Sequence, residues 1–164
     1  MELGVLVNAI GRSPAIFSRL ALLAICLNSF ACSPEQKPKS PTEKNLQALA
    51  VFYGRFISQN KGVGPPNEEA FKKFIRGLRP EEFQSFGVDA SNIDPLFVSP
   101  RDNQPYGIAW GLQGAMPGPD GSAMVIWEQT GVSGKRFVAD AVGKIEEVDE
   151  TTWNQRLAKS KAGK

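Results

Sequence analysis

The stretch that decides the fold is residues 40–57, SPTEKNLQALAVFYGRFI. It opens with a capping box, in which Ser40 accepts a hydrogen bond from the backbone of Glu43 and the Glu43 carboxylate reaches back. Pro41 suits the first helical position, because an N–H there would have no partner. Apolar side chains then recur every three or four residues, at Leu46, Leu49, Tyr53, Phe56 and Ile57. These signals predict a helix of about four turns that buries one stripe.

A second, shorter helix is expected after the glycine- and proline-rich break at residues 61–66. Asn67 is its expected N-cap, and two glutamates follow where the helix dipole favours anions. Gly77 is its expected stop. The apolar face of this helix consists of Phe71, Phe74, Ile75 and Leu78. One further helical turn is expected within residues 80–87.

Beyond Asp94–Pro95 the pattern becomes that of short strands. The β-type runs are residues 96–98, 106–110, 123–129, 136–141 and 145–148. The glycine-containing separators at 131–134 and 142–144 suit hairpins. We therefore expect an antiparallel meander that the helices cover on one face.

A last short helix is expected to begin at Thr151 or Thr152 and to pack Trp153 and Leu157. The predicted fold class is α+β: a long N-terminal helix and a second short helix packed on a small antiparallel β-meander, in a single domain over residues 44–158. The remaining residues, 159–164, are rich in lysine and are expected to form a flexible basic tail.

The N-terminal residues have the three parts of a signal peptide. Two arginines precede the apolar run at residues 20–27, and Ser29 and Ala31 supply small side chains before Cys32. This apolar run has eight residues, whereas a transmembrane helix needs roughly 20. We therefore expect residues 1–31 to be removed.

The cleavage site itself, LNSFAC at residues 27–32, resembles a bacterial lipobox, with Ser29 in place of the usual leucine. The resemblance implies that Cys32 becomes the first mature residue and receives a diacylglyceryl group. The alternative is an ordinary signal peptide cut after Ala31, which leaves Cys32 as a free thiol. Lipidation is favoured because Cys26 is removed, so that Cys32 is unpaired and stands directly at the cut.

A polar tether is expected to follow the lipidated cysteine. Residues 33–39, SPEQKPK, hold two prolines and no apolar side chain, which is typical of an extended spacer. We assign residues 32–43 to the lipidated cysteine and this tether. Ser33 after the cysteine resembles the pattern that double-membrane bacteria send to the outer membrane. The expected location is therefore exported and membrane-anchored, facing the periplasm or the cell surface, at the outer membrane.

Composition argues against several classes of function. Removal of the signal peptide leaves about 130 residues, the size of one ordinary domain. The chain has 19 basic and 17 acidic residues, a net charge of +2, without the clustered basic face that nucleic acid requires. It has no histidine, which removes Ser-His-Asp and Cys-His catalysis and most catalytic zinc sites. We expect no enzymatic activity, no metal and no cofactor.

Several segments resemble known families. VGPPNEEAFKKFIRGL at 63–78 and PYGIAWG at 105–111 resemble the globular part of type II secretion pseudopilins, in which a P-x-x-E-x-A-type helix precedes a DPWGNPY-like loop. Residues 96–111 and 125–149 also resemble a set of uncharacterised bacterial lipoproteins. The resemblance covers about residues 44–150 and implies a pseudopilin-like fold. Pseudopilins retain an apolar N-terminal helix that this chain is expected to lose, so we expect no pilus-like polymer.

The most specific polar stretch is SPRDNQPY, residues 99–106. Arg101 and Asp102 are candidate binding residues, but the same stretch suits a type I turn in which Asp102 bonds local amides. Asp120, together with Asp94 and Asp102, offers oxygen ligands of the kind that some pseudopilins use for calcium. Their spacing does not fit an EF-hand, and the turn at residues 117–121 also explains Asp120. Both interpretations stay open at this point, with no metal site predicted.

Two further patterns have ordinary explanations. Gly131–Arg136 has two residues between its glycines where a phosphate loop needs four, and a predicted strand follows, which favours a hairpin turn. Glu128 with Glu146 or Glu147 supplies the residue types of a glycosidase pair, but nothing in the sequence places them across a cleft.

Two functions from different classes remain. The first is an envelope lipoprotein that presents a non-catalytic domain to another envelope protein or a structural assembly. The second is a lipid-tethered module that binds a small ligand or glycan. An exposed apolar cluster of roughly several hundred Å² favours the first. A concave pocket lined by Trp110, Trp127 and Trp153, with Arg101 and Asp102 converging on it, favours the second, although burial in the single core is the more ordinary role of tryptophan.

Overall fold

A computed structural model describes residues 38–112, 116–118 and 121–162, all within a unit that spans residues 38–164. The expected lipid attachment at Cys32, the signal peptide 1–31 and the candidate residue Asp120 lie outside the described residues.

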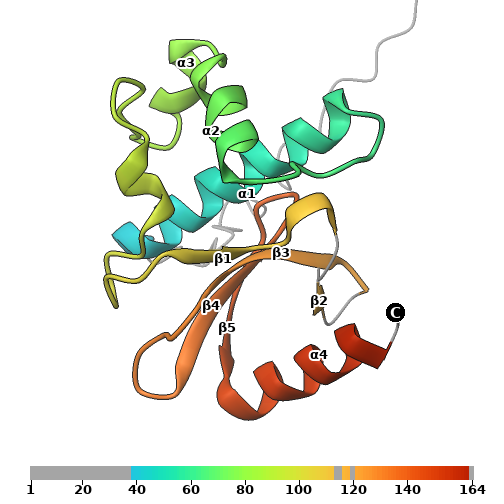
Figure 1. The fold of residues 1–164 in the computed structure, drawn as a ribbon. Coiled ribbons are helices and arrows are strands. Elements are labelled where there is room, and N and C mark those ends of the chain that lie inside the picture. The colour runs from blue at the N-terminus through green and yellow to red at the C-terminus, as the bar shows by residue number, and fades with distance from the viewer. Residues whose placement is uncertain (1–37, 113–115, 119–120, 163–164) are drawn as a thin grey trace, which may run out of the picture. The chain divides into compact units, whose positions relative to one another are not determined.

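Helices come first in the chain, and the strands and a last helix follow (Figure 1). The elements are α1 (Pro41–Gln59), α2 (Glu68–Arg76), α3 (Pro80–Gln84), the 3-10 helix η1 (Asp94–Phe97), β1 (Tyr106–Ile108), the 3-10 helix η2 (Trp110–Leu112), β2 (Met116–Pro117), β3 (Ala123–Glu128), β4 (Lys135–Asp140), β5 (Ile145–Asp149) and α4 (Glu150–Ala162). The fold is α+β, as predicted.

The first helix begins where the sequence predicted. Both halves of the capping box are present: the Glu43 N–H donates to Ser40 Oγ at 3.3 Å, and the Ser40 N–H donates to Glu43 Oε2 at 2.8 Å. The predicted apolar stripe packs into the core, with its first three members fully buried and the last two partly buried. Residues 41–43, assigned to the tether from the sequence, belong to α1, and Thr42 among them is buried.

The second and third helices also follow their local signals. Asn67 caps α2, because its side chain accepts a hydrogen bond from the Ala70 N–H at 2.9 Å. Gly77 ends the helix, as predicted. Phe71 and Ile75 are fully buried, whereas the other two predicted apolar residues of this face remain partly exposed. The further turn begins at Pro80 as α3.

The strands form the predicted antiparallel meander, in the order β1-β3-β4-β5, with the short β2 also paired to β3. A β-bulge interrupts the pairing of β3 with β4 between Met124 and Ile126. The bulge lets two consecutive residues, Val125 and Ile126, pack into the same core, while Met124 packs on the opposite face of the sheet.

One predicted strand, at residues 96–98, is wrong. The chain forms η1 there, because Pro95 suits the first position of a helical turn and the Leu96 N–H donates to the Ile93 carbonyl at 3.1 Å. Leu96 and Phe97 are both buried in the core on the α1 side of the sheet. Trp110, placed in a strand from the sequence, likewise lies in η2.

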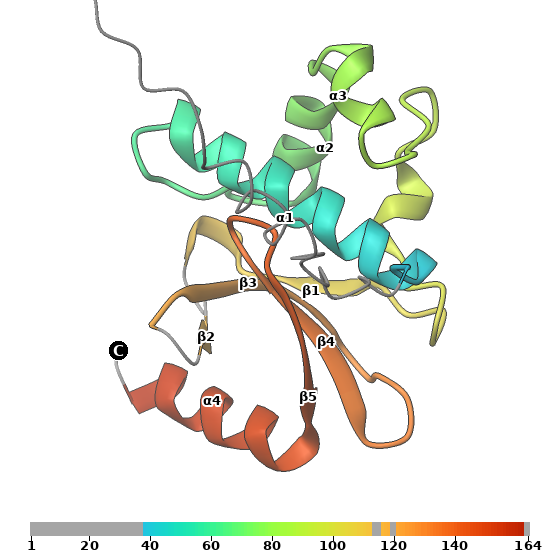
Figure 2. The ribbon, with the colours of Figure 1, turned by 180° about the vertical axis from the view of Figure 1, so that it is seen from behind.

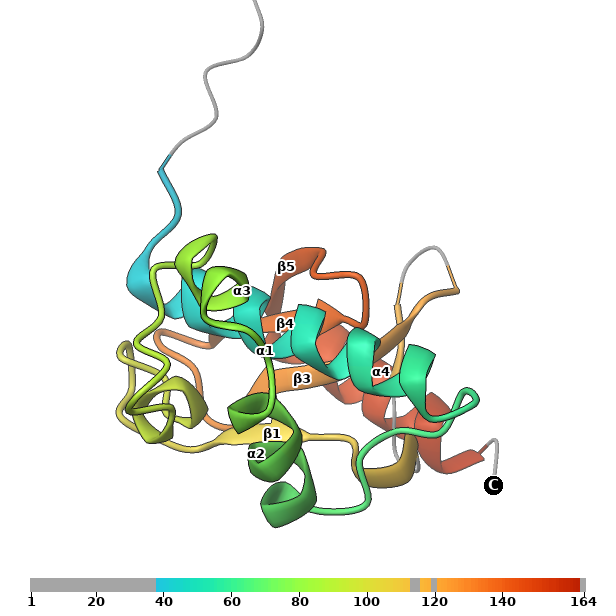
Figure 3. The ribbon, with the colours of Figure 1, turned by 90° about the horizontal axis from the view of Figure 1, so that it is seen from above.

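The sheet is covered on both of its faces, not on one as predicted. Opposite views place α1 on one side of the sheet and α4 on the other (Figure 1, Figure 2). From above, α1 runs across β3 and β4 (Figure 3). We call these the α1 face and the α4 face. The α1 face carries a large core, and the α4 face a separate small cluster of Met124, Val138, Val148 and Trp153.

The last helix is longer than predicted and differently capped. Asp149, rather than Thr151 or Thr152, is the cap, since its Oδ1 accepts a hydrogen bond from the Thr152 N–H at 2.7 Å. The helix continues through Ala162, so residues 159–162 are helical where the sequence suggested a flexible tail. Alanine and lysine are good helix formers, and they extend an element that Trp153 already anchors.

Two glycines permit close contacts that position these layers. A Cβ at Gly54 would overlap the carbonyl of Ala141, so α1 approaches the end of β4 more closely than any other residue type would allow. Gly107 is paired with Trp127 across β1 and β3, and a Cβ at Gly107 would overlap the indole ring. The tryptophan ring therefore covers the glycine. Within the described part of the chain, no helix is both long and apolar enough to cross a membrane.

Candidate functional site

The candidate loop at residues 99–104 is a closed turn. The Ser99 N–H donates to the Gln104 carbonyl at 2.9 Å, and the Asn103 N–H donates to the Ser99 carbonyl at 2.8 Å. Asn103 adopts a left-handed backbone with φ of 54°, a conformation that asparagine tolerates better than most residues. This geometry agrees with the turn interpretation of the sequence.

Arg101 ties this loop to the β3–β4 hairpin. Its Nη2 donates to the carbonyls of Val132 at 3.1 Å and Lys135 at 2.9 Å, and its Nη1 pairs with Glu147 at 2.9 Å. The guanidinium also lies over the ring of Phe137, with Cζ 4.8 Å from the ring centroid. The guanidinium is thus bonded within the chain and joins the loop at residues 99–104 to the β3–β4 hairpin and to β5.

Asp102 is used in the same way. One of its carboxylate oxygens accepts from the Gln104 N–H at 3.1 Å, which is the local amide bond expected of a turn aspartate. The other accepts from the Gly131 N–H at 2.9 Å, in the β3–β4 hairpin. Arg101 and Asp102 therefore come together, as the sequence suggested, but they converge on the hairpin rather than on an open pocket.

A buried carboxylate beneath this loop was not identified as a structural centre from the sequence. Glu128 is fully buried. It accepts hydrogen bonds from Ser99 Oγ at 2.8 Å and from the Phe137 N–H at 2.8 Å, and its Oε2 lies 3.9 Å from Arg101 Nη1. The pairing of β3 with β4 ends at Trp127 and Val138, so the carboxylate accepts from a backbone donor just past the end of that ladder. Both carboxylate oxygens of Glu128 are therefore bonded to groups of this chain.

Both tyrosines of the chain are buried, and Tyr106 is paired with Glu128 across β1 and β3. Burial raises the pKa of Tyr106, and the charges of Glu128 and Asp102 act in the same direction. Its hydroxyl donates to the Thr42 carbonyl at 3.1 Å, which joins the sheet to the start of α1. Burial also raises the pKa of Tyr53, whose hydroxyl donates to the Ala109 carbonyl.

The remaining oxygen ligands considered for calcium are used elsewhere. Asp94 pairs with Lys72 at 2.8 Å, and this lysine is the main cause of its lowered pKa. Asp102 accepts the two backbone bonds described above. Over the ranges that the structure describes, which leave out Asp120, no cluster of three or more acidic or cysteine side chains is arranged to hold a metal ion.

The tryptophans do not form one platform. Trp110 packs edge-on against Phe71 on the α1 face, with ring centroids 6.4 Å apart. Trp153 packs on the α4 face, where its ring lies 5.9 Å from that of Trp127. The single core expected from the sequence is therefore two clusters, with Trp127 contacting both.

The other two sequence patterns are also structural. Gly131–Arg136 is a hairpin turn, in which Val132 and Lys135 exchange backbone hydrogen bonds at 2.8 and 3.1 Å. Glu147 pairs with Arg101, whereas Glu146 pairs with Arg156 at 2.9 Å from the direction of α4. The two β5 glutamates thus serve opposite faces of the sheet.

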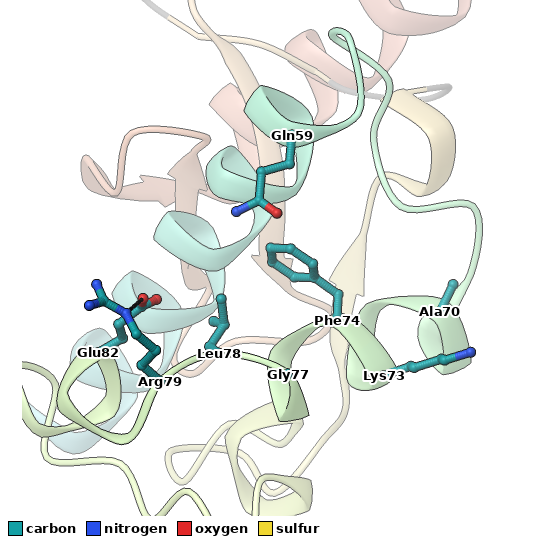
Figure 4. A pocket seen from close by; sticks show the side chains of 8 residues that line it. All are labelled: Gln59, Ala70, Lys73, Phe74, Gly77, Leu78, Arg79 and Glu82. Atoms are coloured by element: carbon teal, nitrogen blue, oxygen red, sulfur yellow. Dashed lines mark hydrogen bonds and ion pairs between the residues drawn. The ribbon is translucent and has the colours of Figure 1, made fainter.

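An open groove of about 500 Å³ lies where α1 ends and α2 turns into α3 (Figure 4). Half-buried Phe74 and Leu78 form its floor, and Gln59 faces them from the last turn of α1. Lys73 and Arg79 stand at the rim. The apolar pattern predicted Phe74 and Leu78 on a buried helix face, so the sequence did not indicate this groove.

Comparison with known proteins adds no relative. No family model matches the chain, and neither a curated protein nor a solved structure matches it. The pseudopilin-like order of elements therefore remains a prediction from the sequence, and the geometry above is the basis for any functional argument.

Proposed function

We propose that this chain is an exported lipoprotein, held on a membrane by lipid on Cys32, whose α+β domain binds another envelope protein without catalysing a reaction. The proposal that the domain binds a protein without catalysis rests on how the loop at residues 99–104 is bonded. Arg101 and Asp102, the side chains with the greatest potential to bind a small ligand, are bonded to the β3–β4 hairpin instead. The loop thus acts as part of a rigid scaffold.

The proposal of export and lipid attachment rests on the sequence pattern of the N-terminal residues. A short apolar run, small side chains at the cut and a cysteine directly after it favour export with lipid attachment. Each buried methylene contributes about 0.8 kcal/mol, so two or three acyl chains hold a protein on a bilayer far more firmly than one.

The lipid anchor is tested by replacing Cys32 with alanine. The wild-type protein should partition into the detergent phase, and Cys32→Ala should move it to the soluble periplasmic fraction. Mass spectrometry of the mature wild-type N-terminus should find an acylated cysteine. An unmodified Cys32 thiol at that N-terminus would contradict the proposed lipid attachment.

Partner binding is tested by cross-linking in intact cells that produce the full chain. A discrete band between this protein and one other envelope protein is expected. A regular ladder of homo-oligomers would instead indicate polymerisation of the pilin type. A protein that forms no adduct, but whose melting temperature rises with a glycan or another small molecule, would favour the ligand-binding alternative.

A further inference from the structure

The groove between α1, α2 and α3 has an apolar floor that the core holds in place. The Phe74 ring packs edge-on against Phe56, with ring centroids 5.1 Å apart at 75°. Phe56 in turn contacts the buried Phe71. Phe74 is therefore a fixed surface rather than a side chain free to fold away, and Leu78 continues it towards α3.

The acidic and basic side chains at the groove differ in their exposure to solvent. Glu82, the acidic residue of the lining, is bonded to Arg55 from α1 and to Arg79 at 3.2 Å. Its side chain is 11% exposed, whereas that of Arg79 is 73% exposed. The Glu82 carboxylate is thus paired and largely buried, whereas the Arg79 guanidinium is exposed and also lies 3.4 Å from Glu81.

Two adjacent lysines of α2 differ in their ion pairs. Lys72 pairs with Glu68 at 2.7 Å and with Asp94 at 2.8 Å, away from the groove. Lys73 lies at the groove and, among the described residues, takes part in no ion pair. The rim therefore presents Lys73 as a cation outside any described ion pair. Beside it, Arg79 is an exposed guanidinium that already contacts Glu81 at 3.4 Å and Glu82 at 3.2 Å and has further N–H donors to offer.

The groove also lies away from the place where the tether joins the domain. The chain enters at residues 38–40, at the start of α1, whereas Gln59 is the last residue of this 19-residue helix. At 1.5 Å per residue the two ends are roughly 28 Å apart. The groove and the first described residues of the domain therefore lie at opposite ends of α1.

We propose that this groove docks an acidic, amphipathic segment of the partner protein. An apolar side chain of the segment covers Phe74 and Leu78, and aspartate or glutamate side chains beside it pair with Lys73 and Arg79. This inference rests on the proposed function, since it names the surface and the chemistry of that partner. The groove is of the size of ordinary ligand sites, about 300–1,000 Å³, which suits a short motif rather than a whole domain face.

The test uses the photo-crosslinking amino acid p-benzoylphenylalanine in the full chain in its own cells. It is placed at Gln59 on the groove or at the exposed Gln155 on α4. The position at Gln59 should give one heterologous adduct, and mass spectrometry should map it to a partner peptide with an apolar residue flanked by carboxylates. The position at Gln155 should give little of that adduct.

Charge reversal makes the test specific. Lys73→Glu should lower the yield of the adduct at Gln59 by about tenfold, because it places like charges together. Lys44→Glu makes the same change at an exposed position in the first turns of α1 and should leave the yield within about twofold. Exchanging the mapped carboxylate of the partner for lysine should restore the adduct with Lys73→Glu.

The possible failures are distinguishable. A heterologous adduct at Gln155 but not at Gln59 would overturn the groove and leave the proposed function standing. An adduct at Gln59 that ignores Lys73→Glu, or that maps to a basic peptide, would overturn the stated chemistry. An adduct with a second copy of this chain would replace the partner by a dimer. No adduct at either position, in cells that show no cross-linked partner at all, would count against both proposals.

Discussion

The two faces of the sheet are covered in different ways. On the α1 face, eighteen buried hydrophobic residues form one cluster among the described residues, contributed by three helices, η1 and the strands. Its centre is Phe71, whose ring lies within 5.8 to 6.5 Å of four other aromatic rings: Tyr53, Phe56, Phe97 and Trp110. Edge-to-face pairs of this kind add to the energy of apolar burial.

On the α4 face, four buried residues form the cluster and charged groups complete it. Arg136 lies over the ring of Trp153, with Cζ 4.3 Å from the centroid, and it bonds to Glu150 at 2.5 Å. Arg156 bonds to both carboxylate oxygens of Glu146 at 2.9 Å. These contacts set where α4 lies, but ion pairs near a surface contribute little net stability.

From this difference we infer that the two faces of the one domain differ in stability. Local opening is easiest where few apolar contacts must be broken. We therefore expect α4 to detach before the α1 face unfolds, and each prediction below tests that order.

The largest effect is expected on the α1 face. Leu49 is fully buried in α1, so Leu49→Asp forces an unpaired carboxylate into the core. The loss should exceed about 4 kcal/mol and should leave the domain without a cooperative urea transition. Lys44→Asp, an exposed change in the same helix, should shift the unfolding free energy by no more than about 0.5 kcal/mol. A cooperative transition for Leu49→Asp near the wild-type midpoint would show that this stripe is not core.

The next effect is expected on the α4 face. Trp153 is 8% exposed and contacts both Trp127 and Arg136. Trp153→Ala should cost about 3 kcal/mol, and the cost should fall on α4. Hydrogen exchange should then show rapid exchange along residues 150–162 with protection retained in β3 and β4. Equal loss of protection in α1 would mean that the two faces unfold as one.

A smaller effect is expected at the end of the β3–β4 ladder. Glu128→Ala removes the acceptor of Ser99 Oγ and of the Phe137 N–H, which leaves a buried backbone donor unpaired. The expected loss is about 2 kcal/mol in urea denaturation. Glu128→Gln keeps one carbonyl oxygen and should lose less. Identical losses for the two variants would indicate that the negative charge of Glu128, which both changes remove, stabilises the site, and that the retained volume and carbonyl oxygen of Glu128→Gln contribute nothing.

The elements that were predicted correctly from the sequence are those specified by local signals. The caps at Ser40 and Asn67, the stop at Gly77 and the hairpin glycines each act within a few residues, and each is found in the structure. By contrast, residues 96–98 are apolar and of β-type character, which outweighed the local signal of Pro95 in the sequence analysis. In the structure Pro95 lies in the first turn of η1, and Leu96 and Phe97 pack into the core on the α1 face.

In the candidate site, the sequence predicted the turn at residues 99–104 but not the hydrogen-bond partners of its side chains. The bond from Asp102 to Gln104 is local, so the turn signal identified it. The partners of Arg101 are the carbonyls of Val132 and Lys135, 31 and 34 residues away, and they depend on how the hairpin folds over the loop. Glu128 appears as an ordinary strand residue in the sequence, and its burial follows from the sheet register.

The smallest effect at neutral pH, and the one that isolates the α1 face, is expected from the two tyrosines. Tyr53 and Tyr106 are the only tyrosines of the chain, and both belong to the cluster on that face. Burial raises the pKa of each above its ordinary value of about 10. Their contribution to stability is therefore complete below about pH 10 and is lost as pH rises towards their raised folded pKa values, because the unfolded chain loses these protons first.

In that alkaline window, each tyrosine that ionises only on unfolding lowers the unfolding free energy by about 1.4 kcal/mol per pH unit. Tyr106→Phe should therefore make the decline of stability above pH 10 shallower by about that amount, while its loss at pH 7 is limited to the hydrogen bond with the Thr42 carbonyl, about 1 kcal/mol. Lysines also titrate in this range, so the comparison of variant with wild type, rather than the slope of either alone, carries the result. The ultraviolet band of tyrosinate should appear together with unfolding of the α1 face and after α4 has lost its exchange protection. Tyrosinate that forms near pH 10 while α4 is still protected would reverse the order of the two faces.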